Sequence, residues 1–266
     1  ENYLTFKREI IDRGVLTVLG GYSYQKNKNE NSYAASRGFL TNTNSYRNLG
    51  AGTVFLKPDS GLSETELISA FGRLNFDYAD KYLLTFTARR DGSSSFSKNY
   101  KYGTFPSVSL GWVPTKEEFW KENKIINTLK LRFSYGVTGN SRIPNFAYQA
   151  IIEGGRNYTF GNSGVVTSGS TPGRIANPEL KWEETTQTNI GFDTKLLNDF
   201  TFTFDWYKKK TSGILLDPEL PGYVGNEAPP FQNIGEMHNS GLEFELGYKK
   251  RINDFNLSVN ANMATI

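Results

Sequence analysis

Residues 68–89, ISAFGRLNFDYADKYLLTFTAR, decide the fold class of this chain. From Ile68 to Tyr78 apolar residues alternate with mostly polar ones, a tight turn follows at 79–81, and the alternation resumes from Tyr82 to Arg89. Successive side chains of a β-strand point to opposite faces, so each segment has one apolar and one polar face. About ten residues is the length at which a tilted strand crosses a bilayer between lipid and a polar lumen. The pattern predicts part of a transmembrane β-barrel.

The same alternation recurs along the chain, and long and short connections take turns between the segments. We predict strands at roughly 1–7, 15–25, 66–78, 82–91, 105–113, 128–138, 182–196, 200–210, 235–249 and 255–265. The short connections are 8–14, 79–81, 197–199 and 250–254, and the long ones are 26–65, 92–104, 139–181 and 211–234. Outer-membrane barrels have short periplasmic turns and long extracellular loops. We therefore expect an all-β antiparallel up-and-down meander, with residues 1–266 forming one partial barrel segment.

The connection 114–127 is longer than the other turns at its end. Thr115 and Glu118 have the spacing of a capping box, in which Thr115 is the N-cap and Glu118 reaches back to it. We expect one or two helical turns here, at the periplasmic rim.

The two faces of the predicted strands differ in character. On lipid-facing positions we expect Tyr22, Tyr24, Trp182 and Trp206 at the extracellular side, and Tyr78, Tyr82, Trp112 and Tyr248 at the periplasmic side. Inward positions collect the charged residues Arg73, Asp77, Arg89, Asp193, Lys195, Asp205, Glu243 and Glu245. A soluble β-sandwich would use these charges as the wet face of each sheet. That alternative accounts for many aromatic residues but not for their segregation to strand ends.

The composition excludes several classes of protein. The chain has no Cys, which removes disulfides, zinc–thiolate sites and cysteine nucleophiles. The net charge is only +3, and Lys208-Lys209-Lys210 fits a solvated loop edge better than a nucleic-acid patch. The mean hydropathy of −0.51 does not argue against a barrel, because lumen residues and loops are polar. No apolar run reaches the roughly 18 residues of a membrane helix, and no signal peptide begins the chain, so we expect a fragment.

The sequence predicts no enzyme, no cofactor and no metal site. His238 is the only histidine, which excludes a two-histidine metal site. Gly161-Asn162-Ser163-Gly164 lacks the spacing of a nucleophile elbow, and Gly50-Ala51-Gly52 lacks the remaining glycine of a dinucleotide-binding loop. Glu243 and Glu245 share one face with other charges, so a structural role is favoured over glycosidase chemistry.

The long loops carry the candidate binding residues. Their Tyr, Asn and Gly content suits sugar rings, which bind by stacking and hydrogen bonding. The candidates for contact with ligand or partner are Arg37, Tyr46, Tyr100, Tyr102, Tyr158 and Phe160. Packing of one loop against another, or contact with a partner protein, would use the same residue types.

Several ordered blocks of sequence resemble the barrel of SusC/RagA-type TonB-dependent receptors. They are LISAFGRLNFDY (67–78), KYLL (81–84), RDGSSSF (90–96), FPSVSLGW (105–112), LKLRFSYGVTGN (129–140), NPELKWE (177–183), NIGFD (189–193), NIG (233–235) and NSGLE (239–243). The resemblance covers roughly residues 15 to 266. One departure is Ser95, which stands where the family usually has a basic residue before Phe96, so an ion pair from that position is in doubt.

The resemblance implies part of a 22-stranded outer-membrane barrel of a Gram-negative bacterium. Such receptors import oligosaccharides or peptides, powered by a TonB complex that acts through an N-terminal plug, with a SusD-like lipoprotein over the extracellular mouth. On this resemblance we expect the plug and the terminal strands to lie outside the given sequence. The expected partners are therefore the SusD-like lipoprotein, the TonB complex through the missing plug, outer-membrane lipid and the substrate, with no nucleic acid.

The main rival is a carbohydrate-binding or adhesin β-domain that does not transport, and a passive pore is a third possibility. The rival predicts a second layer over the lipid-facing side chains. These are Leu84, Phe86, Val108, Leu110, Phe133, Ile190, Phe202 and Phe204. A transporter leaves this band bare, which in a soluble protein would be an aggregation hazard.

Overall fold

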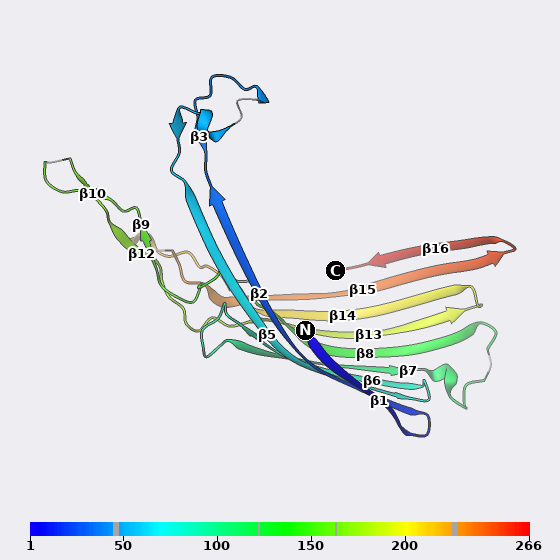
Figure 1. Ribbon diagram of the computed structural model, residues 1–266. Helices are drawn as coiled ribbons and strands as arrows, with labels where there is room; N and C mark the ends of the chain where they lie inside the picture. Colours follow the sequence, from blue (N-terminus) through cyan, green and yellow to red (C-terminus); the bar gives the residue numbers. More distant parts are fainter. Residues whose placement is uncertain (45–47, 122, 163, 225–227) are drawn as a thin grey trace.

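One open, curved sheet of ten strands forms the body of the molecule (Figure 1). The computed structural model describes residues 1–44, 48–121, 123–162, 164–224 and 228–266. The strands of this sheet are β1 Asn2–Ile11, β2 Gly14–Tyr33, β5 Asp59–Tyr78, β6 Tyr82–Ser93, β7 Tyr102–Trp112, β8 Ile126–Asn140, β13 Glu183–Leu196, β14 Phe200–Leu216, β15 Gln232–Ile252 and β16 Phe255–Ala264. Each pairs antiparallel with the next in this order. The predicted antiparallel meander is confirmed, and β1 and β16 are its two open edges.

The smaller elements lie in the connections between these strands. They are β3 Ser36–Arg37, β4 Val54–Phe55, β9 Ile151–Gly154, β10 Tyr158–Thr159, β11 Val166–Thr167 and β12 Ser170–Arg174, with the 3₁₀ turns η2 Leu49–Ala51, η3 Pro114–Lys116 and η4 Gly222–Val224. The small strands form three separate two-stranded pairs. Within the described residues, no helix is long and apolar enough to span a bilayer.

Short turns gather at one end of the sheet and long connections at the other, as the sequence predicts (Figure 1). The β5–β6 turn shows how the short ones are closed. The Lys81 N–H donates to the Tyr78 carbonyl at 2.9 Å, and Ala79 and Asp80 both have positive φ, 55° and 51°. Two consecutive positive φ angles define the type I′ turn, whose twist matches the twist of paired strands. The same geometry recurs at Leu197 and Asn198.

The β2–β5 hairpin extends well past the predicted strand ends. Its pairing continues to Tyr33 and Asp59, so the expected 26–65 connection is shorter than predicted. Beyond Gln25 both faces of this ribbon are exposed and polar, and the apolar alternation that marks a strand in the sequence disappears there. Ion pairs support the ribbon instead: Lys26 Nζ lies 2.6 Å from Glu64 Oε1 and 3.5 Å from Glu66 Oε1.

The helical turn after β7 begins two residues earlier than predicted, and no capping box closes it. In η3 the N-cap position is Val113, which provides no side-chain cap, and Pro114 opens the turn with its fixed φ. Thr115 therefore lies inside the turn, where its hydroxyl oxygen accepts from the Leu129 N–H at 3.2 Å. The prediction of Thr115 as an N-cap is wrong because the hydroxyl is used to join the turn to β8.

The buried core lies at the long-loop end, where β7 and β8 separate above the Ser107–Gly136 pair. It consists of Phe96, Phe105, Ala147, Leu180 and Trp182. Trp182 is only 6% exposed, and its ring packs 5.2 Å from Phe96 and 5.3 Å from Phe105. Its indole N–H donates to the Lys101 carbonyl at 3.2 Å. The prediction of a lipid-facing Trp182 is wrong, because the residue precedes β13 and strand alternation does not apply to it.

Candidate functional site

The sheet has an apolar face that no other layer covers in the part of the chain that the structure describes. Cross-strand pairs place Phe76, Leu84, Leu110, Phe133, Ile190 and Trp206 in one row across six strands. Phe86, Leu110 and Ile190 are 48%, 48% and 50% exposed. Tyr78, Tyr82 and Trp112 border this face at the short-turn end, and Tyr22 and Tyr24 lie toward the long-loop end. In the described part of the chain, the second layer that the adhesin alternative predicts is not present.

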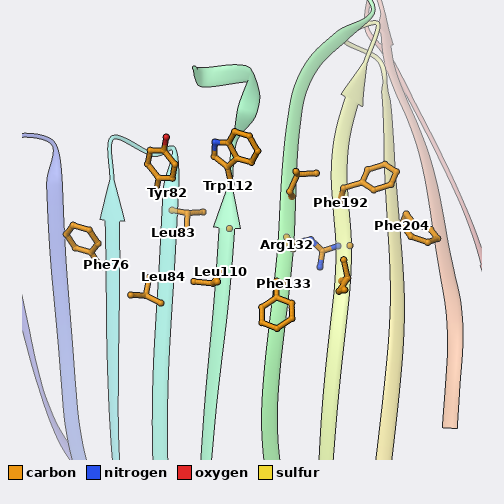
Figure 2. Close-up of a pocket in the computed structure, with 14 residues that line it drawn as sticks. Phe76, Tyr82, Leu83, Leu84, Leu110, Trp112, Arg132, Phe133, Phe192 and Phe204 are labelled. Atoms are coloured by element: carbon orange, nitrogen blue, oxygen red, sulfur yellow. The ribbon is translucent and has the colours of Figure 1, made fainter. Parts of the chain in front are cut away.

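A shallow hollow of about 570 Å³ lies in the apolar face near the short-turn end. Figure 2 shows that its lining comes from neighbouring strands, with Tyr82 and Trp112 at its upper rim and Phe133 and Phe204 among its walls. Aromatic and branched aliphatic side chains dominate this lining. The hollow has the chemistry of an apolar contact surface, not of a catalytic pocket.

The opposite face carries the charged residues that the sequence placed inward, and Arg132 joins two of them. Its Nε lies 2.9 Å from Asp193 Oδ2 and its guanidinium NH2 lies 2.8 Å from Asp205 Oδ2. Cross-strand pairing aligns Gly111, Arg132, Gly191, Asp205 and Glu243 in one row. Because the two glycines beside Arg132 have no side chains, the guanidinium can cross Gly191 to reach Asp205.

This row explains why Arg132 is needed on the charged face. Asp205 stands directly opposite Glu243, and like charges in such cross-strand pairs are destabilising. The Arg132 cation offsets that repulsion. Arg132 was not among the inward charges predicted from the sequence, although its alternation with Leu131 and Phe133 in LKLRFSY gives it the inward parity of Lys130.

A second charged group lies on the same face toward the long-loop end. Arg89 Nε donates to both carboxylate oxygens of Asp91, at 2.7 and 2.9 Å, and its NH2 donates to Ser69 Oγ at 2.7 Å. The guanidinium also lies 5.5 Å from the centre of the Phe71 ring. Nearby Ser95 is 5% exposed, and its N–H donates to Ser93 Oγ at 3.2 Å. These bonds join β6 to Ser69 of β5 near the long-loop end of the sheet.

At the short-turn end, Glu117 ties the η3 turn to the ends of β6 and β7. Its carboxylate accepts from Trp112 Nε1 and from Lys81 Nζ, both at 3.1 Å. Hydrogen bonds to the carboxylate hold the pKa of Glu117 below its ordinary value. The bond from Tyr82 has the largest effect on this pKa, and those from Trp112 and Lys81 come next. A carboxylate with a lowered pKa contributes stability above the ordinary value of 4.5 and loses it as the pH falls through the folded-state pKa.

Glu117→Gln should therefore remove the acid sensitivity of this turn. In the full-length protein, hydrogen exchange of amides around 113–121 should speed up as the pH falls below 4.5 after correction for intrinsic exchange, and the variant should lack that transition. The control is Glu118→Gln, which changes the exposed neighbouring carboxylate. The same acid transition in Glu117→Gln as in the unchanged protein would contradict this role.

The structure brings some of the candidate loop residues together and separates others. Tyr158 and Phe160 pack edge to face, 5.1 Å apart, on the arm that carries β9 to β12. Arg37 lies in β3 at the tip of the β2–β5 ribbon, far from that arm (Figure 1). Tyr102 begins β7, under the Arg90 guanidinium at 5.2 Å, and Tyr46 lies outside the described residues. The candidates that the structure describes therefore do not all form one site.

Tyr100 is the candidate with the most site-like surroundings. It lines a polar hollow together with Asn177, Glu179, Lys181 and Gln232. Asn177 and Asn233 shape this hollow from within: Asn177 Nδ2 donates to the Phe231 carbonyl at 2.6 Å, and Asn233 Nδ2 donates to the Lys181 and Gly213 carbonyls at 2.8 Å each. These bonds join the connections before β13 and before β15. Lys181 and Gln232 were not predicted as site residues, because nothing in the sequence places these two parts of the chain side by side.

Residues 3–265 match the family model described as TonB dependent receptor-like, beta-barrel. The chain belongs to this family. It is 44% identical over 270 residues to TonB-dependent receptor P3 of Formosa agariphila, covering 98% of this chain and 26% of that protein. It is 39% identical over 203 residues to TonB-dependent receptor SusC of Bacteroides thetaiotaomicron, covering 74% of this chain and 20% of that protein.

The fold agrees with solved structures of the same kind. The structure of the RagAB peptide transporter superposes with a TM-score of 0.84 at 27% identity, covering 98% of this chain and 29% of that chain. The chain spans about a quarter of the length of the curated relatives it matches. It is a segment of a TonB-dependent receptor barrel, and the resemblance found in the sequence is confirmed.

Proposed function

We propose that this segment forms part of the wall of an outer-membrane receptor that imports oligosaccharides or peptides. The observation that best supports this proposal is the contrast between the two faces of a single-layer sheet. The apolar face, with half-exposed Phe86, Leu110 and Ile190, suits lipid, and the face that carries Arg132, Asp193 and Asp205 suits a water-filled lumen. On this proposal the short turns are periplasmic and the long connections are extracellular.

The whole receptor would draw energy from a TonB complex through its plug domain and would work with a SusD-like lipoprotein over its mouth. The similarity to SusC and to the RagAB peptide transporter supports this partner. The long-loop end supplies the surface for it, since it carries the β2–β5 ribbon and the β9–β12 arm (Figure 1). Arg37, Tyr100, Tyr102, Tyr158 and Phe160 are the described candidates for contact with substrate or lipoprotein, and Tyr100 is the best placed of them.

Deleting the gene of the full-length receptor should abolish uptake of one class of labelled substrate, either oligosaccharide or peptide. Two substrate panels offered to the deletion strain and to the complemented strain give the measurement. Tyr100→Ala in the complementing copy should lower uptake, because it removes the ring that lines the polar hollow. Tyr223→Ala is the control, since that side chain is 90% exposed and does not line the hollow. Normal uptake of both classes after deletion, or a receptor absent from the outer-membrane fraction, would contradict the proposal.

A further inference from the structure

The run Lys208-Lys209-Lys210 lies inside β14, not at a loop edge as the sequence suggested. Strand alternation places Lys208 and Lys210 on the apolar face, in line with Phe204 and Trp206, and places Lys209 on the charged face. Lys208 and Lys210 are both exposed. Two cations therefore continue the line of aromatic residues on the face that we assign to lipid.

Hydroxyl and imidazole groups flank both lysines across the neighbouring strands. Lys208 lies between Thr188 of β13 and Ser240 of β15. Lys210 lies between Thr186 of β13 and His238 of β15. The next row toward the short turns is apolar, with Ile190, Trp206 and Leu242. Two rows of cationic and hydroxyl donors thus stand directly above a row of apolar side chains.

The height of these rows matches the edge of a bilayer. Phe200 begins β14 beside Tyr248 at the short-turn end. At about 3.3 Å per residue, Lys210 lies about 33 Å along the strand from Phe200. With a tilt of about 40° this is roughly 25 Å along the membrane normal, the height of the apolar band of outer-membrane barrels. Lys210 therefore lies at the level of the outer-leaflet headgroups. Lys208 lies about 5 Å lower, a span that its long side chain can bridge to reach the same level.

The charges of this patch are only partly neutralised. Lys210 Nζ lies 3.0 Å from Glu236 Oε2, and the same carboxylate contacts His238 Nε2 at 2.6 Å. Within the described residues, Lys208 makes no ion pair. Lys26, which also lies on the apolar face, differs because two carboxylates hold it. The β14 patch thus presents one free cation and a second that shares its carboxylate.

We propose that Lys208, Lys210 and their hydroxyl neighbours bind the phosphate groups of an outer-leaflet lipid headgroup. The inference rests on the proposed function, since it requires the apolar face to lie in a bilayer. The ammonium and hydroxyl groups are hydrogen-bond donors, and the oxygens of a phosphate are the matching acceptors. The acyl chains of the same lipid run over Ile190, Trp206 and Leu242. One lipid molecule therefore contacts the lysine and hydroxyl rows with its headgroup and the apolar row with its chains.

The test uses the full-length receptor, purified in detergent and titrated with diphosphoryl lipid A. Lys208→Ala/Lys210→Ala should weaken binding about 25-fold, since each basic residue near an anionic surface contributes about fivefold. Lys209→Ala, in the same strand but on the opposite face, should bind within about twofold of the unchanged receptor. Glu236→Gln should tighten binding, because it frees Lys210, and a variant with a damaged fold would not bind more tightly.

Further control measurements distinguish a lipid phosphate from free phosphate, and they separate a failure of the lipid site from a failure of the transport proposal. Dephosphorylated lipid A should bind the unchanged receptor as weakly as diphosphoryl lipid A binds the double variant. Inorganic phosphate should not compete at the concentration of the lipid, and effective competition would overturn the assignment to a lipid. Equal binding by the double variant and by Lys209→Ala would overturn the site itself. Recovery of the receptor from the outer-membrane fraction is scored separately, so a failed site with a correctly located receptor leaves the transport proposal standing.

Discussion

Phe86→Arg in the full-length receptor should lower the free energy of unfolding by about 2–4 kcal/mol, the cost of an Arg at the bilayer midplane of a barrel. Phe86 pairs with Leu74 and Val108 in the middle of the apolar face, and its side chain is 48% exposed. A guanidinium at this position has no lumen to enter and must deform the lipid around it. Heat-modifiable migration and the yield in the outer-membrane fraction measure the effect.

Thr87→Arg is the matched control, because Thr87 is the next residue and lies on the charged face. Its hydroxyl oxygen already accepts from Arg73 Nε at 3.3 Å, so the site is polar. The introduced guanidinium would face Arg73 directly across the two strands, and that repulsion should cost about 0.2–1 kcal/mol, well below the cost of Phe86→Arg. The yield of this variant should therefore be clearly higher than that of Phe86→Arg. Equal damage from the two changes would show that the faces of β6 are wrongly assigned, and a one-residue error there would reverse every assignment made from that strand.

Trp182→Ala should have a comparably large effect, but one confined to the long-loop end. Removing a buried Trp costs about 3–5 kcal/mol where the cavity cannot collapse. Trp182 fills the space between Phe96 and Phe105 and bonds to the Lys101 carbonyl, so its loss leaves a void and an unpaired acceptor. Hydrogen exchange should accelerate in 93–101 and 177–182, while the amides of β14 should keep their protection.

The comparison variant is Ile152→Ala, whose side chain belongs to the same 141–182 connection but is 78% exposed. It should change exchange little anywhere. Limited proteolysis provides an independent reading, since a loosened 177–182 segment should be cut faster in Trp182→Ala only. Unchanged protection around Trp182 would mean that the cluster does not hold the loops in place.

The sequence predicts the strands well wherever one face is apolar and the other polar. All ten main strands overlap the predicted segments, and the turns at 79–81 and 197–199 lie as expected. The prediction fails where the two-faced pattern ends. The outer part of the β2–β5 ribbon is exposed to solvent on both faces, so no apolar alternation in residues 26–33 distinguishes a strand from a loop. Trp182 has the parity of a lipid-facing residue but stands outside the strand that parity describes.

The candidate sites were harder to predict because they depend on register between strands. Asp193 and Asp205 were placed on the correct face from alternation alone. Their link through Arg132 requires β8, β13 and β14 to be aligned so that Gly191 falls between the cation and Asp205. The hollow around Tyr100 depends on bonds between connections far apart in the chain, such as Asn177 with the Phe231 carbonyl. Loop residues chosen by type alone therefore fell in separate places.

The anchoring of the 141–182 connection at both of its ends has an evolutionary consequence. Ala147 and Tyr148 near its start, and Leu180 and Trp182 at its end, belong to or pack against the buried cluster, whereas the β9–β12 arm between them is largely exposed. Doubling the length of such a closed loop costs only about 0.6 kcal/mol of chain entropy. Insertions, deletions or exchange of the arm can therefore accumulate without shifting the β8–β13 register. Descendants of one ancestral wall can diversify what they display to their surroundings while inheriting the same scaffold.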